Sequence, residues 1–179
     1  MSRSCILLAL GLVVFAILAR LLPHAPNVAP VAALAIFAGL YLPKKWGGVL
    51  PLAAMLVSDA LIGFYDWRIM AAVYGSFAVT WLAVALAVRR EKNIVTITTA
   101  TVGGSLLFFL VTNAAVWFFG TMYPHTLSGL GMSYTMAIPF FRNTLVGDVG
   151  YTMLLVGGYE LAMYMVRTAR MTRSARTEA

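Results

Sequence analysis

The chain has 179 residues, of which 61% are hydrophobic and 11% are charged, and its formal net charge is +7. Soluble domains are about 45–50% apolar and about 25% charged, so this composition excludes an ordinary soluble fold and predicts one all-α integral membrane domain over residues 1–179. The basic residues lie mostly beside apolar runs, as topology determinants do, which argues against a nucleic-acid partner.

Six apolar stretches follow one another along the chain, and we expect each to form a helix of a polytopic bundle. A membrane span needs about 20 apolar residues, so about six spans joined by short loops fill this length. The second stretch is short, and an alternative is that it forms one re-entrant hairpin with the third. The predicted helices cover approximately residues 5–22, 28–42, 46–64, 69–88, 98–120 and 143–166, and a basic tail covers residues 167–179.

The first stretch resembles a signal peptide in having Arg3 before an apolar run. We expect a retained helix, because no A-x-A cleavage site follows and Arg20 stands where small residues are required. The single Cys5 excludes an internal disulfide and a multi-cysteine metal site. Two histidines and scattered carboxylates at no ligand spacing argue against a metal, and we expect no cofactor.

Lys and Arg are distributed unequally between the two sides of a six-span chain, and the side that is richer in them is the cytoplasmic one. The richer side holds Arg3, Lys44, Lys45, Arg89, Arg90, Lys92, Arg167, Arg170, Arg173 and Arg176, and the other side holds Arg20, Arg68 and Arg142. We therefore expect a multi-pass protein of the cytoplasmic (inner) membrane with both termini in the cytoplasm. The basic tail would face anionic lipid.

With this orientation, polar residues of the predicted spans gather toward the extracytoplasmic side. Ionisable residues inside a membrane cost on the order of 2.5–3.5 kcal/mol each and are functional by default, which singles out Asp59 and Asp148. The alternative is a structural role, in which each pairs with Arg142, Arg68 or Arg20, or caps a helix, and so stabilises the bundle. Together with aromatic neighbours, a one-sided polar layer predicts a ligand pocket open to the outside. The candidate substrate-binding residues are Asn27, Asp59, Tyr74, Asn113, Trp117, Arg142, Asn143 and Asp148.

The longest predicted connection, Thr121–Tyr134, contains Gly129 and Gly131. It could serve as a lid over the pocket or be a loosely packed loop. No catalytic signature occurs: the sequence has no G-x-S-x-G elbow, no H-E-x-x-H and no phosphate-binding glycine loop. We therefore expect a protein that is not an enzyme and that works through binding, or through energy supplied by a partner.

Several motifs resemble the substrate-binding S components of energy-coupling-factor (ECF) transporters. They are the short second helix, the Pro43-Lys-Lys-Trp-Gly-Gly48 turn and the following Leu-Val-Ser58-Asp59. The segment Arg20-x-Leu-Pro-His24-x-Pro-Asn27-x-x-Pro30-x-x-Ala-x-x-x-Phe37 resembles an uncharacterised bacterial membrane family grouped with them. The resemblance implies a six-helix bundle with an extracytoplasmic pocket for a vitamin or a related small molecule.

The same resemblance implies a partner, the ATPase and transmembrane coupling subunits of an ECF transporter. S components often carry an Ala-x-x-x-Ala patch on the first helix for that contact, whereas this chain has Ala9, Ala16 and Ala19 there. A stand-alone role and self-association therefore stay open. A function of another class, a non-transporting structural or assembly subunit of the membrane, is the alternative to ligand uptake.

Overall fold

The computed structural model describes the backbone of residues 3–177 and the side chains of residues 5–172, and every regular element in this part of the chain is a helix. The all-α prediction is therefore confirmed. The elements are α1 (Arg3–Leu21), α2 (Val31–Tyr41), α3 (Lys44–Gly47), α4 (Val49–Ile62), α5 (Trp67–Leu86), the 3-10 turn η1 (Val88–Arg90), α6 (Ile94–Phe119), α7 (Leu127–Thr152), the π turn η2 (Met153–Gly157) and α8 (Gly158–Thr177).

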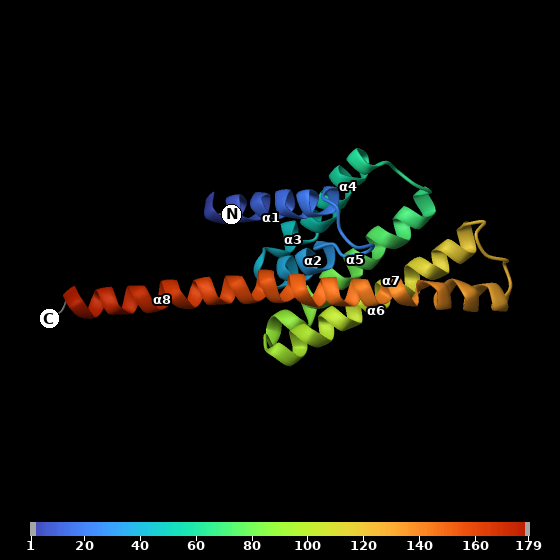
Figure 1. Ribbon diagram of the computed structural model, residues 1–179. Coiled ribbons are helices and arrows are strands. Elements are labelled where there is room, and N and C mark those ends of the chain that lie inside the picture. The colour runs from blue at the N-terminus through green and yellow to red at the C-terminus, as the bar shows by residue number, and fades with distance from the viewer. Residues whose placement is uncertain (1–2, 178–179) are drawn as a thin grey trace.

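The chain runs back and forth along one axis (Figure 1). α1, α4 and α6 run in one direction, whereas α2, α5 and the continuous α7–α8 helix return in the other. The first and last described residues therefore lie toward the same end. The connections 63–66 and 120–126 lie toward the opposite end of the bundle, and the segment 22–30, which joins α1 to α2, lies between the two ends.

Four helices are long and apolar enough to cross a membrane, namely Lys44–Ile62, Trp67–Arg90, Ile94–Phe119 and Leu127–Thr172, as expected of a membrane protein. Two further apolar helices, Cys5–Leu21 and Val31–Tyr41, are shorter. α2 has 11 residues and is therefore about 17 Å long, against a hydrocarbon core of about 30 Å. By length alone the structure thus supports fewer than the six spans predicted.

α2 is the centre of the bundle, because all of its residues from Val31 to Leu40 are buried. It packs against α4, α5, α6 and α7, which explains why its sequence is apolar on every face. Gly39 allows the closest of these contacts: a Cβ at this position would lie 2.8 Å from Val84 Cγ1 on α5. A short helix can be accommodated here because other helices, rather than lipid, surround it.

The last helix differs most from its predicted range of 143–166, since it begins at Leu127 and continues through η2 to Thr177. Most of the predicted loop Thr121–Tyr134 is therefore helical, and the structure has no lid there. The Thr126 hydroxyl accepts a hydrogen bond from Gly129 N and so caps the helix, and Pro139 lies within it. Gly129 looks like a loop residue in the sequence, but it lies in the helix. Glycine is needed at this position because a Cβ would lie 1.9 Å from Pro124 O.

Candidate functional site

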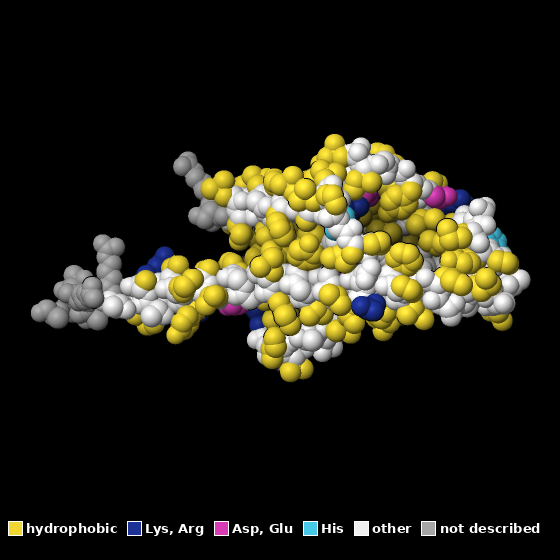
Figure 2. Space-filling view, viewed as in Figure 1, with side chains coloured by type: hydrophobic (Ala, Val, Ile, Leu, Met, Phe, Trp, Pro, Cys, Tyr) yellow, Lys and Arg dark blue, Asp and Glu magenta, His cyan; other side chains and the backbone are white. Residues whose placement is uncertain are grey.

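A cavity of about 620 Å³ opens in the half of the bundle that carries the 22–30 segment and the 63–66 connection. α1, α2, α4, α5, α6 and α7 all contribute to its wall, and Figure 2 shows a hollow with basic and acidic side chains near its edge. Its walls are mostly apolar, with a few polar groups among them. Its lining residues are Arg20, His24, Asn27, Ala29, Val31, Ala32, Met55, Ile62, Tyr65, Ile69, Val73, Phe77, Phe108, Phe109, Thr112, Asn113, Val116, Ala137, Phe140, Phe141, Thr144 and Asp148.

The lining residues of α6 and α7 recur at intervals of three and four, because such residues share one face of a helix. On α6 this face runs from Phe108 to Val116, and on α7 it runs from Ala137 to Asp148. Asp148 is the lining residue furthest along α7, about 30 Å from Leu127 at 1.5 Å per residue. It is buried in the cavity wall, whereas the lining residues His24 and Tyr65 are exposed and come from the segment 22–30 and the connection 63–66.

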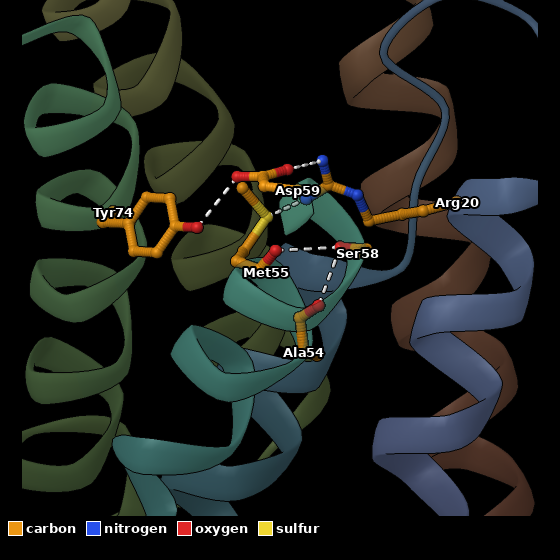
Figure 3. Close-up of polar contacts among 6 residues, drawn as sticks. All are labelled: Arg20, Ala54, Met55, Ser58, Asp59 and Tyr74. Atoms are coloured by element: carbon orange, nitrogen blue, oxygen red, sulfur yellow. Dashed lines mark hydrogen bonds and ion pairs between the residues drawn. The ribbon is translucent and has the colours of Figure 1, made fainter. Parts of the chain in front are cut away.

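An ion pair between Arg20 and Asp59 joins α1 to α4 beside the cavity (Figure 3). Arg20 Nη2 donates to Asp59 Oδ1 at 2.5 Å, and Nη1 contacts the sulfur of Met55. Tyr74 Oη of α5 donates to the second carboxylate oxygen, Asp59 Oδ2, at 2.8 Å. Asp59 is 2% exposed, so its charge is compensated inside the protein and one residue ties three helices together.

Arg20 lines the cavity with a side chain that is 16% exposed, whereas neither Asp59 nor Tyr74 is a lining residue. The pairing of Asp59 with Arg20 matches the structural alternative considered from the sequence. Ser58, the neighbour of Asp59, is also satisfied within α4, since its hydroxyl donates to Ala54 O at 2.7 Å. The polar side chains of this part of the layer therefore find their hydrogen-bond and ion-pair partners within the protein.

Asp148 has a different environment. It is 4% exposed, it lines the cavity, and it forms no ion pair within the described part of the chain. Its one hydrogen-bond partner there is the hydroxyl of Ser105 on α6, 2.7 Å from Asp148 Oδ2. The same hydroxyl lies 3.0 Å from Thr101 O, and with one proton to donate it satisfies one acceptor at a time.

The segment 22–30 forms the rim of the cavity. Asn27 has φ +64°, a left-handed conformation that asparagine adopts more readily than most residues, and its side chain is exposed. Asn143 Nδ2 of α7 donates to Pro26 O at 3.2 Å and so holds the segment in place. Gly147 lets Val28 approach α7 closely, because a Cβ there would lie 3.2 Å from Val28 Cα.

The connection between α4 and α5 supplies the other side of the rim. Burial and, to a lesser extent, the nearby Asp59 raise the pKa of Tyr65 to about 12, while Arg20 opposes the shift. Asp66 caps α5 by accepting from Arg68 N, and its carboxylate pairs with the Arg68 guanidinium at 2.7 Å. These hydrogen bonds lower the pKa of Asp66 to about 2.

The predicted site residues thus separate into three groups. Asn27, Asn113 and Asp148 line the cavity, and Asp59, Tyr74 and Asn143 support its walls through hydrogen bonds. Trp117 and Arg142 do not line it: Trp117 Nε1 donates to Pro124 O at 2.9 Å in the 120–126 connection, and the side chain of Arg142 is exposed.

Sequence reasoning missed the apolar part of the lining, above all five phenylalanines. These are Phe77, Phe108, Phe109, Phe140 and Phe141. Helical spacing could have identified Phe109, which lies four residues from Asn113, and Phe141, which lies two turns from Asp148, because such residues share one face of a helix. Their rings also pack on one another: the centroids of Phe77 and Phe108 are 5.2 Å apart, and those of Phe109 and Phe141 are 4.7 Å apart.

Within the described residues, no group of three or more His, Cys, Asp or Glu side chains lies close enough together to hold a metal ion. The polar side chains that line the cavity instead carry one carboxylate, one guanidinium, one imidazole, two amides and three hydroxyl groups. Such a set recognises an organic molecule by hydrogen bonds and charge.

The sequence profile of a family described as "Family of unknown function (DUF6580)" matches residues 2–171, so the chain belongs to that family. No match was found among curated proteins or among solved structures.

Proposed function

We propose that this member of the DUF6580 family is a membrane-embedded subunit that binds a small molecule and takes part in its uptake, in the manner of an ECF-transporter S component. The observation that carries this proposal is the cavity of about 620 Å³. Ligand sites for small organic molecules are clefts of about 300–1,000 Å³ with mostly apolar walls and a few placed polar groups. The cavity has both properties, and Asp148 and Asn113 supply polar atoms to it.

The proposal includes six crossings of the inner membrane with both termini in the cytoplasm. The alternating direction of α1, α2, α4, α5, α6 and α7–α8 supports six passes, and α2 can be short because it is shielded from lipid. Non-helical backbone at membrane depth is tolerated where protein or a cavity surrounds it, as for the segment 22–30. The cavity would then open toward the extracytoplasmic side.

Accessibility labelling of single cysteines tests this orientation after Cys5 has been replaced by alanine. A cysteine at the exposed Met122 should react with an impermeant reagent in intact cells, and one at the exposed Arg90 should react only after permeabilisation. The reverse pattern would place the cavity mouth in the cytoplasm and would end the uptake proposal.

Ligand binding can be tested by thermal denaturation of the purified protein in the presence of vitamins, nucleobases and their precursors. A ligand at about 100 times its Kd adds about 2.7 kcal/mol to stability. Val116→Trp should weaken the stabilisation, because an indole on this lining residue occupies part of the cavity.

Val102→Trp is the matched control, since it makes the same change on an exposed position of α6. Its ligand response should equal that of the wild type. If no compound stabilises the wild type, or if Val116→Trp retains the full response, the cavity is not a ligand site.

Energy for uptake would come from a partner, because the sequence shows no nucleotide-binding motif. The proposed partners are the ATPase and transmembrane coupling subunits of an ECF transporter, or a second copy of the chain. Affinity purification from native membranes, followed by identification of stoichiometric partners, separates these two cases. Purification of the chain with neither would indicate a stand-alone protein.

One observation favours the second candidate function, a structural or assembly subunit. α8 extends beyond the rest of the bundle (Figure 1), and past its first turn its described part packs extensively against no other helix. Leu161, Tyr164 and Met165 are each more than half exposed on it. A scaffold would use this helix to bind another membrane protein. It predicts that truncation after Tyr159 removes a partner without changing any ligand response.

A further inference from the structure

We infer that the ligand of the cavity is an organic cation, whose positive group pairs with the carboxylate of Asp148 while phenylalanine rings surround its apolar body. This inference rests on the proposed function, because it names the chemical class of the molecule that the cavity would hold. The observation behind it is a contrast between two charged residues that line the cavity. Arg20 is paired with Asp59, whereas Asp148 has no counter-ion among the described residues.

The basic side chain that lines the cavity wall is already neutralised. The two terminal nitrogens of Arg20 contact Asp59 and Met55, and the Arg20–Asp59 separation is 2.5 Å. The guanidinium would have to leave Asp59 to bind an anion, and it would then leave a carboxylate that is 2% exposed without its counter-ion. His24 stands at the rim, where its Nδ1 lies 2.6 Å from Leu22 O. The described lining residues therefore offer an anionic ligand no basic side chain that lacks a partner.

Asp148, which is buried in the cavity wall, has no such counter-ion among the described residues. Its carboxylate accepts one hydrogen bond there, from Ser105, and that hydroxyl is shared with Thr101 O. A buried carboxylate without a cationic partner is costly in a membrane protein, and the cost is offset when a positive group binds beside it. Because Asp148 lines the cavity, a bound molecule can supply that group.

The walls around Asp148 suit the rest of such a molecule. Phe77, Phe108, Phe109, Phe140 and Phe141 all line the cavity. Aromatic faces attract cations through the negative potential of the ring, and proteins recognise quaternary ammonium groups in aromatic cages for this reason. An anionic ligand would be repelled by both features, the ring faces and the carboxylate.

Three probes of similar size and different charge test the inference: benzyltrimethylammonium, benzyl methyl sulfone and benzylsulfonate. Binding of each to the purified full chain is measured by titration calorimetry, with thermal denaturation as a second readout. The wild type should bind the cation at least about tenfold more tightly than the sulfone, and the sulfonate most weakly. This order in the wild type tests the inference even if a variant fails to fold.

Asp148→Asn should reduce the affinity for the cation at least about tenfold and should change the affinity for the sulfone less than about twofold, since it removes charge and keeps an acceptor for Ser105. Asp148→Glu should recover part of the preference for the cation. Asp66→Asn is the control, because it removes a partly exposed carboxylate that does not line the cavity, and it should leave all three affinities unchanged.

The outcomes separate the two proposals. Tighter binding of the sulfone or the sulfonate than of the cation, or an unchanged preference in Asp148→Asn, would overturn the cation inference and leave the cavity as a ligand site. Binding of none of the three probes, together with no response to the wider compound set, would overturn both.

Discussion

Asp59 and Asp148 are two buried carboxylates in the same half of the molecule, and their surroundings are opposite. Asp59 is held by a guanidinium and a phenol from two neighbouring helices, and it is not a lining residue of the cavity. Asp148 is held by one shared hydroxyl and faces the cavity. The same residue type in a membrane-embedded bundle can thus be part of the framework or be available to a ligand.

The comparison teaches how to interpret an ionisable residue inside a predicted span. Both carboxylates are conspicuous in the sequence for the same reason, the cost of burying a charge. What separates them is whether the protein itself supplies the counter-charge. Variants that remove or restore that counter-charge are therefore the most direct way to test the distinction.

The largest expected effect is that of Asp59→Ala, which leaves Arg20 without its counter-ion. Breaking a buried ion pair by removing one partner costs about 3–5 kcal/mol, and the lower end applies here because Arg20 is 16% exposed. The free energy of unfolding of the purified protein, measured in mixed detergent and denaturant, should fall by that amount.

A double variant, Arg20→Met with Asp59→Leu, should recover most of this loss, because well-packed apolar residues can replace a buried ion pair at little cost. If the double variant is as unstable as Asp59→Ala, the pair is not what the single variant disrupted.

Tyr74→Phe should have the next largest effect. It removes the hydrogen bond to Asp59 Oδ2 and keeps the aromatic ring, and hydrogen bonds to charged groups contribute about 1.5–3 kcal/mol. The loss should be absent when Tyr74→Phe is combined with Asp59→Leu and Arg20→Met, and a thermodynamic cycle of the four proteins measures this coupling. An additive result would contradict the network shown in Figure 3.

Asp148→Asn should change stability by less than about 1 kcal/mol or should increase it, because the amide oxygen still accepts from Ser105 and an uncompensated charge is removed. The same unfolding measurement applies. A loss as large as that of Asp59→Ala would mean that Asp148 belongs to the framework after all, and the distinction between the two carboxylates would fail.

The smallest expected effect concerns Asp66 at the rim, which provides a carboxylate outside the spans for comparison. Its pKa is lowered to about 2 in the folded protein by Arg68, below its ordinary value of 3.8, so its contribution to stability is present above about pH 4 and is lost as the pH falls toward 2. The melting temperature of Asp66→Asn should therefore vary less with pH over this window than that of the wild type.

If the two melting curves keep the same separation from pH 4 to pH 2, the Asp66–Arg68 pair does not form in solution. Since Asp66 and Arg68 are partly exposed to solvent, raising the salt concentration should also reduce the difference in melting temperature between the wild type and Asp66→Asn.

Periodicity and composition in the sequence were sufficient to predict an all-helical bundle, and Asp59 and Asp148 were identified as the polar residues that needed an explanation. Helix ends were predicted less well: α6 begins at Ile94, after a capping box formed by the side chains of Asn93 and Thr96, whereas the predicted helix began at residue 98. The start of α7 was not predictable, because Gly129 and Gly131 resemble loop residues and their helical conformation depends on the turn formed by residues 120–126.

Hydropathy alone determined that this chain suits a membrane, because a sequence with 61% hydrophobic residues cannot hide them from water within 179 residues. Only the tertiary structure decided which carboxylate would be paired. Arg20 and Asp59 are far apart in the sequence, and the packing of α1 against α4 brings them within 2.5 Å, whereas the face of α7 that carries Asp148 meets Ser105 and the cavity. The cost of burying a charge is a property of the residue, but the group that compensates it is a property of the fold.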